Sequence, residues 1–295
     1  MLHDDGVLVI DKPAGMTSQQ AVSKVKRILG VKKAGHAGTL DPMATGVLVV
    51  GIGRATRLLG YIAGTNKQYT ATIRLGQATT TDDAEGEPVG SLVDATGLSD
   101  GQIAAAMAPM VGEIQQVPSA VSAIKVDGRR AYAMVRAGVS VELAPRTVRV
   151  SRFEVLQRRD DQGFVDLDVV VDCSTGTYIR ALARDLGQVL GVGGHLVALR
   201  RTLVGRFEVA SAVSVDNVDA GDIEPIEAVA RAVFDCITVD EAMIEGVAHG
   251  QPLPLVVPAN PTAVLSRGSG RFLALYRADG DKSVPVAVFV DGTGR

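Results

Sequence analysis

A single carboxylate inside a glycine-containing loop is the strongest chemical signal in this chain. Asp41 lies within the run Gly35–Gly46, GHAGTLDPMATG, and the apolar segment 47–50 follows directly. Glycine lets such a loop bend sharply and approach a ligand closely, and Pro42 biases Asp41 toward an extended backbone. A carboxylate held in one pose beside a rigid strand is well placed to act on a ligand. The alternative is an ordinary turn in which Asp41 hydrogen-bonds its own backbone.

Two other runs combine a glycine turn with reactive or charged residues. The run 173–180, CSTGTYIR, is typical of a strand end, a turn and a helix start that present Tyr178 and Arg180 together. Its alternative is a helix cap with an exposed arginine. The run 51–56, GIGRAT, imitates a dinucleotide-binding fingerprint, but its sixth position is threonine and the acidic residue expected about 20 positions later is missing. A dinucleotide-dependent oxidoreductase is therefore a weak alternative.

Hydrophobic periodicity predicts the elements that must position these residues. Thr17 or Ser18 can cap a helix that ends at Gly30, and Ser99 with Gln102 forms a capping box before another helix. The predicted strands cover residues 6–10, 46–52, 69–75, 146–155, 164–171 and 195–209, and further helices are predicted at 54–62 and 177–190.

The mixture of strands and helices shows no βαβ rhythm. It favours an α+β fold with a mixed, largely antiparallel central sheet flanked by helices. A chain of 295 residues, 46% hydrophobic, can build a large core and two domains. We expect a catalytic domain at 1–232 and a small β-rich domain at 233–295, where short strands alternate with prolines.

Charge is segregated along the chain. The net charge is -3 overall, yet residues 1–60 carry +4 and 121–210 carry +4, whereas 77–116 carry -7 and 211–295 carry -6. Local potential governs phosphate binding, so an acidic average is compatible with an RNA partner. Solvated faces of mixed charge are the alternative.

Targeting and metal-binding signals are weak. No apolar stretch approaches the ~20 residues that cross a bilayer, and the N-terminus does not look like a signal peptide. The 2 cysteines lie far apart, and with the 4 histidines they show no metal-ligand spacing. We expect a cytoplasmic monomer that has no membrane association and no bound metal.

Six ordered motifs, taken together, resemble the TruB family of bacterial tRNA pseudouridine synthases over about residues 5–210. They are LVIDKPAGMTS at 8–18, the run 35–46, KQY at 67–69, VPSAVSAIK at 117–125, the run 173–180 and GHLVALRR at 194–201. The resemblance implies the pseudouridine synthase fold with an RNA-clasping insertion at about 117–145. It also implies, more weakly, a PUA-like RNA-binding domain at the C-terminus.

The resemblance also implies roles for individual residues. Asp41 matches the catalytic aspartate, and Tyr69 matches a tyrosine that packs on the target base and is a candidate to take the proton from C5. Arg180 matches the arginine that pairs with the catalytic carboxylate. The residues matched to substrate binding or to support of the active-site loop are His36, Tyr178, Leu199, Lys12, Pro13 and Lys125.

The implied reaction isomerises uridine 55 in the T loop of tRNA to pseudouridine. The base must be flipped out, the N1–C1′ bond broken, and C5 joined to C1′. Asp41 could attack C1′, add to C6 of uracil, or assist removal of the 2′ proton, and the sequence leaves these three routes open. The uracil is retained and no electrons change hands, so we expect no cofactor.

One position departs from the family pattern. Thr80 stands where the family usually has an aspartate, although the acidic loop continues through Asp82 and Asp83. A rival function is a non-catalytic RNA-binding protein or tRNA chaperone on the same scaffold. The combination of Asp41, Tyr69 and Arg180 argues against it, because a pure binder has no use for a carboxylate that repels phosphate.

Overall fold

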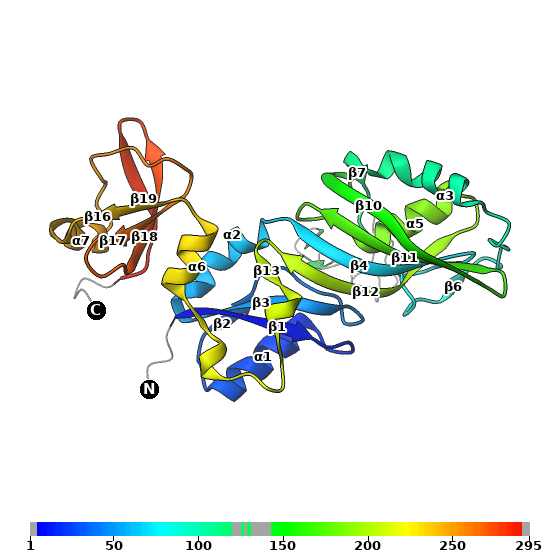
Figure 1. Ribbon diagram of the computed structural model, residues 1–295, viewed down its shortest axis with the longest axis horizontal. Helices are drawn as coiled ribbons and strands as arrows, with labels where there is room; N and C mark the ends of the chain where they lie inside the picture. The colour runs from blue at the N-terminus through cyan, green and yellow to red at the C-terminus, as the bar shows by residue number, and fades with distance from the viewer. Residues whose placement is uncertain (1–4, 120–124, 127–128, 131–142, 291–295) are drawn as a thin grey trace.

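The computed structural model describes residues 5–119, 125–126, 129–130 and 143–290. An 11-stranded sheet with helices packed against it fills most of this region, and a separate 4-stranded sheet lies toward the C-terminus (Figure 1). This architecture confirms the predicted α+β fold.

The main sheet has eight strands in its principal path. In spatial order these are β14 (Val213–Ser214), β1 (Gly6–Lys12), β3 (Thr45–Ile52), β12 (Gly194–Val204), β4 (Lys67–Leu75), β11 (Phe164–Cys173), β10 (Arg146–Asp161) and β7 (Gly112–Gln116). Three short strands pair beside this path: β2 (Ala34–His36), β13 (Phe207–Glu208) and β15 (Glu224–Pro225). The β1–β14 and β3–β12 pairs are parallel, and the other pairs on the path are antiparallel.

Helices cover the faces of this sheet. The α-helices are α1 (Ser18–Leu29), α2 (Leu59–Ala63), α3 (Asp100–Met107), α5 (Ile179–Val189), α6 (Ile226–Val233) and α7 (Glu241–Ala248). The 3₁₀ turns are η1 (Gly53–Leu58), η2 (Ala108–Met110), η3 (Val209–Ser211) and η4 (Ala220–Asp222). Helices α3 and α5 pack on the β4–β11–β10 part, and α1 packs on β1 and β3 (Figure 1). No helix among the described residues is long and apolar enough to cross a membrane.

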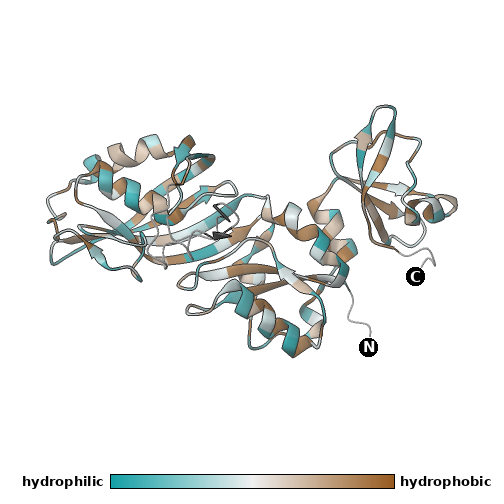
Figure 2. Cartoon of the chain, turned by 180° about the vertical axis from the view of Figure 1, so that it is seen from behind, coloured by the Kyte–Doolittle hydropathy of each residue, from teal (hydrophilic) through white to brown (hydrophobic). Residues whose placement is uncertain are grey.

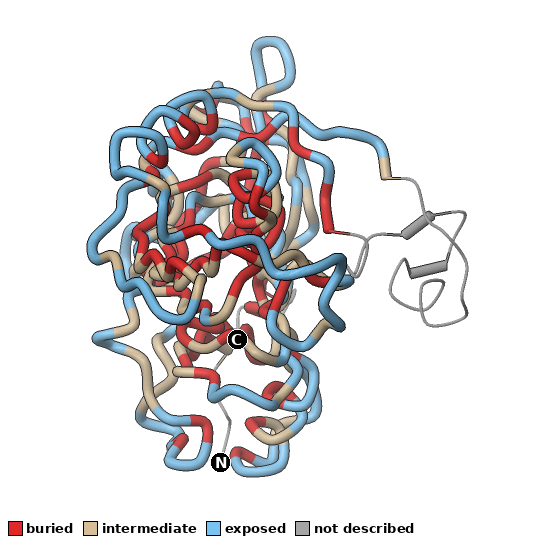
Figure 3. Tube along the Cα trace, turned by 90° about the vertical axis from the view of Figure 1, so that its right-hand side faces the viewer, coloured by how far each residue is buried: buried red, intermediate tan, exposed pale blue. Residues whose placement is uncertain are grey.

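Local sequence explains the elements nearest the site. In β4 buried and partly exposed residues alternate along the whole strand, as the predicted half-buried strand requires. Helix α1 begins with a capping box between Thr17 and Gln20 and ends at Gly30 in the left-handed conformation. Hydrophobic and hydrophilic residues mix along α1, while buried residues gather in the interior of the trace (Figures 2 and 3).

Several predicted boundaries need correction. The segment 54–62 is a 3₁₀ turn, η1, followed by α2, and β12 ends at Val204 because the tight turn at Gly205 reverses the chain into β13. Strand β10 continues to Asp161, with register shifts that absorb its irregular alternation. The dinucleotide interpretation of residues 51–56 is wrong, since β3 runs antiparallel to β1 and Asp5 accepts a hydrogen bond from the Arg54 amide at 2.5 Å.

One short strand pairing joins the two parts of the main sheet. Strands β3 and β12 are joined through the register pairs Thr45–Arg200 and Gly46–Arg201. A β-carbon on Gly46 would lie 2.1 Å from the Arg201 carbonyl oxygen, so this crossing needs glycine. The junction stands directly after Asp41 in the chain, which places the candidate carboxylate where the two parts of the sheet meet.

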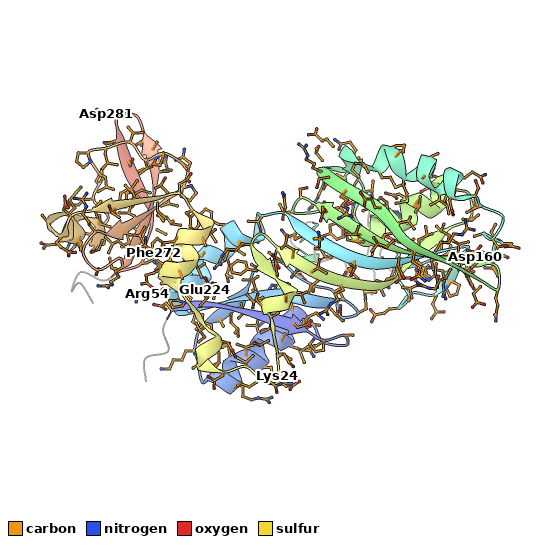
Figure 4. All side chains as sticks on the ribbon, in the orientation of Figure 1. Lys24, Arg54, Asp160, Glu224, Phe272 and Asp281 are labelled. Atoms are coloured by element: carbon orange, nitrogen blue, oxygen red, sulfur yellow. The ribbon has the colours of Figure 1, made fainter. Side chains whose placement is uncertain are left out.

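The second sheet contains β16 (Cys236–Val239), β17 (Thr262–Ser266), β18 (Phe272–Asp279) and β19 (Lys282–Val288). Two-stranded ribbons are formed by β5 (Ala78–Thr79) with β6 (Pro88–Val89) and by β8 (Lys125–Val126) with β9 (Arg129–Arg130). Phe272, labelled in Figure 4, belongs to a buried cluster shared with α6. The Arg54 guanidinium donates to the Phe289 carbonyl at 2.6 Å, which ties this sheet to the main one.

Candidate active site

A small cavity lies beside the junction of β3 and β12. Its volume is about 260 Å³, and its lining residues come from four segments of the chain, each of which contributes a predicted site residue. The lining residues are Gly38, Thr39, Leu40, Asp41, Lys67, Tyr69, Thr175, Gly176, Thr177, Tyr178, Ile179, Arg180, Leu199 and Arg201. A volume below the usual 300–1,000 Å³ of ligand pockets suits a group about as large as one nucleobase.

The Asp41 loop, residues 37–44, connects β2 to β3 and forms one side of the cavity. Gly38 has φ +87°, a left-handed conformation that favours glycine. The buried Arg201 guanidinium donates to the carbonyls of Gly38 at 3.1 Å and Thr39 at 3.3 Å, and also to that of Val47 at 2.8 Å. Arg201 therefore holds the first half of the loop against the strand that follows it.

The second half of the loop is held from β1 and α1. The Ser18 hydroxyl donates to the Leu40 carbonyl at 3.0 Å and accepts from the Leu40 amide at 2.8 Å. The Pro42 carbonyl accepts from the Gly15 amide at 2.8 Å and from Lys12 Nζ at 3.3 Å. With the Ala44 amide donating to the Asp41 carbonyl at 3.1 Å, every carbonyl from Gly38 to Pro42 is engaged.

The Asp41 carboxylate meets Arg180 across the cavity. Arg180 Nη2 lies 2.9 Å from Asp41 Oδ2, and the Asp41 side chain is 36% exposed. Arg180 itself is 4% exposed, so the alternative of a helix cap with an exposed arginine is wrong. The pairing that the resemblance implies for these two residues is present in the structure.

Arg180 also joins a second carboxylate. Its Nη1 lies 3.2 Å from Asp83 Oδ2 and donates to the Thr81 carbonyl at 2.9 Å. The Asp83 side chain is 5% exposed, and Asp83 pairs with Leu196 of β12 in an isolated bridge. The acidic loop thus reaches the site through Asp83.

Apolar and aromatic residues complete the cavity. Tyr69 of β4 and Leu199 of β12 are each 8% exposed and line it, and Tyr178 contributes from the segment before α5. Burial raises the pKa of Tyr69, so its phenol is protonated at neutral pH. The structure therefore brings Tyr69, Tyr178 and Leu199 into the same cavity as Asp41 and Arg180.

Lys12 of β1 contacts the Asp41 loop, and the exposed Pro13 takes part through its carbonyl, which Lys12 binds. Lys12 is fully buried, and its Nζ donates to the carbonyls of Pro13 at 2.8 Å and Met16 at 2.7 Å as well as to that of Pro42. Burial lowers the pKa of Lys12 to about 8 although the Asp41 charge opposes this shift; Arg201 contributes a further lowering. These contacts correspond to the loop-supporting role that the resemblance implies.

His36 and Lys125 stand apart from the cavity lining. His36 ends β2, one residue before the Asp41 loop, and burial followed by the Arg201 charge lowers the pKa of its imidazole. Lys125 belongs to the short strand β8, but its side chain lies outside the described residues, as does most of the predicted insertion at 117–145. The described residues contain no group of three or more His, Cys, Asp or Glu side chains that could hold a metal ion.

Sequence reasoning missed several contributors to the site. Arg201 and Lys67 are charged residues at buried strand positions, a pattern that could have drawn attention. Burial, and then the Arg201 charge, lower the pKa of Lys67 to about 8. Ser18 was considered only as a helix cap, but Thr17 is the cap and Ser18 binds the loop.

Comparisons with known proteins identify what the chain is similar to. The family model described as TruB family pseudouridylate synthase, N-terminal domain, matches residues 26–179, and that of the tRNA pseudouridylate synthase B C-terminal domain matches 180–230. The tRNA pseudouridine synthase B of Rhodococcus jostii (strain RHA1) is 52% identical over 98% of this chain and 95% of its own length. That of Mycobacterium sp. (strain KMS) is 64% identical over 72% of this chain and 71% of its own length.

Two solved structures share the fold over almost the whole chain. A crystal structure of a Cbf5-Nop10-Gar1 complex superposes with a TM-score of 0.73 and 26% identity, covering 99% of this chain and 87% of that one. A structure of an H/ACA RNP bound to a substrate RNA containing 2′-deoxyuridine superposes with a TM-score of 0.71 and 25% identity. That match covers 97% of this chain and 86% of the other one.

Proposed function

The chain belongs to the TruB family of pseudouridylate synthases, enzymes that isomerise uridine, and we propose that its substrate is uridine 55 in the T loop of tRNA. The observation that carries the chemical part is the Asp41–Arg180 pair at 2.9 Å inside a nucleobase-sized cavity that Tyr69 also lines. The contacts around this pair support a separate task for each residue in the proposed reaction.

Asp41 supplies the carboxylate that the reaction requires. Breaking the N1–C1′ bond builds positive charge on the ribose, and a fixed carboxylate stabilises that charge as it does in glycosidases. Arg180 orients the carboxylate, and the hydrogen-bonded loop prevents it from drifting away from the base. Because the uracil is retained and no electrons are transferred, the proposed reaction uses no cofactor.

The rest of the cavity receives the extruded base. Flipping a nucleotide out of its stack costs a few kcal/mol, and stacking on an aromatic ring returns ~1–3 kcal/mol. Tyr69 is the buried aromatic residue in position to do this, with Leu199 and Tyr178 as further walls. Proton removal from C5 by Tyr69 remains a prediction from the resemblance.

A basic segment before the Asp41 loop supports binding of the surrounding RNA. Residues 12–40 contain six Lys or Arg and no Asp or Glu. Arg27, Lys32 and Lys33 are exposed, whereas Lys24 of α1, labelled in Figure 4, forms an ion pair with Asp216 and is left out of this set. Since phosphate contacts supply most of the non-specific affinity for RNA, we assign these residues to the stem that carries the target loop.

We extend the proposal to the organisation of the protein. The catalytic domain would span 1–232, and residues 233–295 would form a PUA-like domain that adds RNA contacts. We propose that the enzyme acts as a monomer in the cytoplasm. The chaperone alternative does not explain why a partly exposed carboxylate is paired with a buried arginine in the cavity.

Product mapping tests the substrate assignment. The enzyme is incubated with a T stem-loop RNA, with the same RNA carrying cytidine at position 55, and with one in which uridine is moved by one position. Pseudouridine, located by its mass shift after chemical labelling, is expected at position 55 of the first RNA alone. Equal modification of the displaced uridine, or modification confined to another region of tRNA, would contradict the proposal.

A further inference from the structure

One buried glutamine contacts the backbone of a cavity residue through both of its polar atoms. Gln116 is the last residue of the edge strand β7 and is 2% exposed. Its Nε2 donates to the Tyr178 carbonyl at 3.1 Å, and its Oε1 accepts from the Tyr178 amide at 2.8 Å. The side-chain amide therefore donates to and accepts from the Tyr178 backbone, as the backbone of a neighbouring β-strand would.

This pairing fixes the start of the helix that carries Arg180. Tyr178 is the N-cap residue of α5, with an extended backbone, φ -103° and ψ 109°, and its own side chain makes no cap. Losing the side-chain amide would remove the partner of the half-buried Tyr178 N–H and one of the two donors to the Tyr178 carbonyl, which would keep only its bond from the Leu182 amide at 3.2 Å. Because Arg180 follows by two residues, a shift of Tyr178 would also move the guanidinium that meets Asp41.

A neighbouring contact strengthens the same connection. The residue after Gln116, Val117, accepts a hydrogen bond through its carbonyl from Arg184 Nη2 at 2.8 Å. Arg184 lies one helical turn beyond Arg180 and pairs with Asp82 at 3.2 Å, next to the Asp83 that contacts Arg180. The end of β7 is thus attached to α5 at two points on either side of Arg180.

We propose that Gln116 is a positioning residue for pseudouridine formation, which holds Tyr178 so that Arg180 stays aligned with Asp41. This inference rests on the proposed function. Gln116 does not line the cavity, so it acts through Tyr178 and α5 rather than on the base. The chain offers a matched control, because Gln115 is exposed on the opposite face of β7 and donates to the Thr147 hydroxyl at 2.8 Å.

The first test compares Gln116→Leu with Gln115→Leu. Single-turnover rates and RNA affinities are measured on the T stem-loop RNA. A misplacement of about 1 Å at a reacting group can cost about 100-fold in rate, so Gln116→Leu should lose between about 10-fold and 100-fold. Its affinity for RNA, which is dominated by phosphate contacts, should stay within about 2-fold. Gln115→Leu should match the wild-type protein in both single-turnover rate and RNA affinity.

The second test uses Gln116→Glu and pH, and it decides the question if Gln116→Leu does not fold. Protonated glutamic acid can still donate to the Tyr178 carbonyl and accept from its amide, whereas the carboxylate can only accept. Burial beside a carbonyl raises the pKa of this introduced group above its usual ~4.3. The rate of the variant relative to wild type should therefore be highest near pH 5.5 and fall at least about 10-fold by pH 8.

The outcomes distinguish a failure of the role proposed for Gln116 from a failure of the proposed function. A wild-type rate for Gln116→Leu, an equal loss in Gln115→Leu, or a pH-independent ratio for Gln116→Glu would overturn the role of Gln116. Absence of pseudouridine with the wild-type protein would instead reject the proposed function itself.

Discussion

The two sides of the cavity are held in different ways. In the Asp41 loop, every carbonyl from Gly38 to Pro42 accepts a hydrogen bond, mostly from buried side chains of distant segments. The facing segment, residues 174–180, is fixed at its ends, where Ser174 pairs with Arg149 and Tyr178 pairs with Gln116. Between these ends, Thr175 and Gly176 are exposed.

This difference indicates that the two sides of the cavity have different roles. In the proposed reaction the Asp41 carboxylate must stay in one position relative to the ribose, and a dense set of hydrogen bonds provides that rigidity. Exposed backbone with few hydrogen bonds opens at a lower free energy, so we expect Thr175 and Gly176 to move more readily than the Asp41 loop. Arg180 spans the two sides, since it is attached to α5 and contacts Asp41.

Among the variants that disturb the contact between Arg180 and Asp41, Arg180→Lys is expected to reduce the reaction rate most. Lysine keeps the charge but lacks the planar fork that contacts Asp41 and Asp83 together. The single-turnover rate on T stem-loop RNA should fall about 10²–10³-fold, the usual result of removing one preorganised electrostatic contact. The comparison variant Arg184→Lys should lose far less, because Arg184 pairs with Asp82 and Asp185. Similar losses in both would mean that α5 tolerates no lysine rather than that Arg180 serves the site.

A smaller loss of rate is expected when the support of the Asp41 loop by Ser18 is removed, and Thr17, which caps α1, provides the comparison. Ser18→Ala removes both hydrogen bonds to Leu40 and should slow the reaction by about 10-fold while lowering the free energy of unfolding by about 1–3 kcal/mol. Thr17→Ala removes the cap of α1 and should cost about 1 kcal/mol of stability with little change in rate. Thermal unfolding and single-turnover assays on both variants check this. If Thr17→Ala slows the reaction as much as Ser18→Ala, support of the loop by Ser18 is not the cause.

A further prediction concerns the charge of Lys12. Its pKa is about 8 in the folded protein and 10.5 in the unfolded chain, so between these pH values the unfolded state binds more protons. The Lys12 contribution to the free energy of unfolding should therefore rise by about 1.4 kcal/mol per pH unit in this window. The stability difference between wild type and Lys12→Met should grow accordingly from pH 8 to 10, measured by urea unfolding. A difference that is constant with pH would show that Lys12 has an ordinary pKa.

Activity should move in the opposite direction over the same window. The Lys12 ammonium donates to three carbonyls, whereas the neutral amine has only two protons to donate. Support of Pro42 should weaken as the pH rises through about 8, so the wild-type rate should decline there. A rate that rises in parallel with stability would contradict this role.

The sequence predicts the residues at the centre of the cavity better than the residues that support them. Glycine turns and ordered motifs leave a recognisable pattern around Asp41 and Arg180, and the pairing of these two side chains is confirmed. Asp83 was noticed only as part of an acidic loop, since its contact with Arg180 depends on the pairing of that loop with β12. Gln116 has no distinctive sequence context, because its role depends on a residue 62 positions away.

The fold was predicted in class and in most elements for a similar reason. Alternation identified β4, and capping residues identified α1, both of which are local properties. The two-residue junction between β3 and β12 is a long-range feature that local patterns do not encode. It determines where the cavity lies, and only the structure shows it.

The central claim is that Asp41 performs the chemistry while the surrounding residues hold it in place. Asp41→Asn preserves the size of the side chain and removes its charge, so it tests this claim most directly. Single-turnover formation of pseudouridine in T stem-loop RNA should fall at least about 10⁴-fold, while RNA affinity measured in parallel stays close to that of the wild type. Turnover within about 10-fold of wild type, with RNA still bound, would contradict the account.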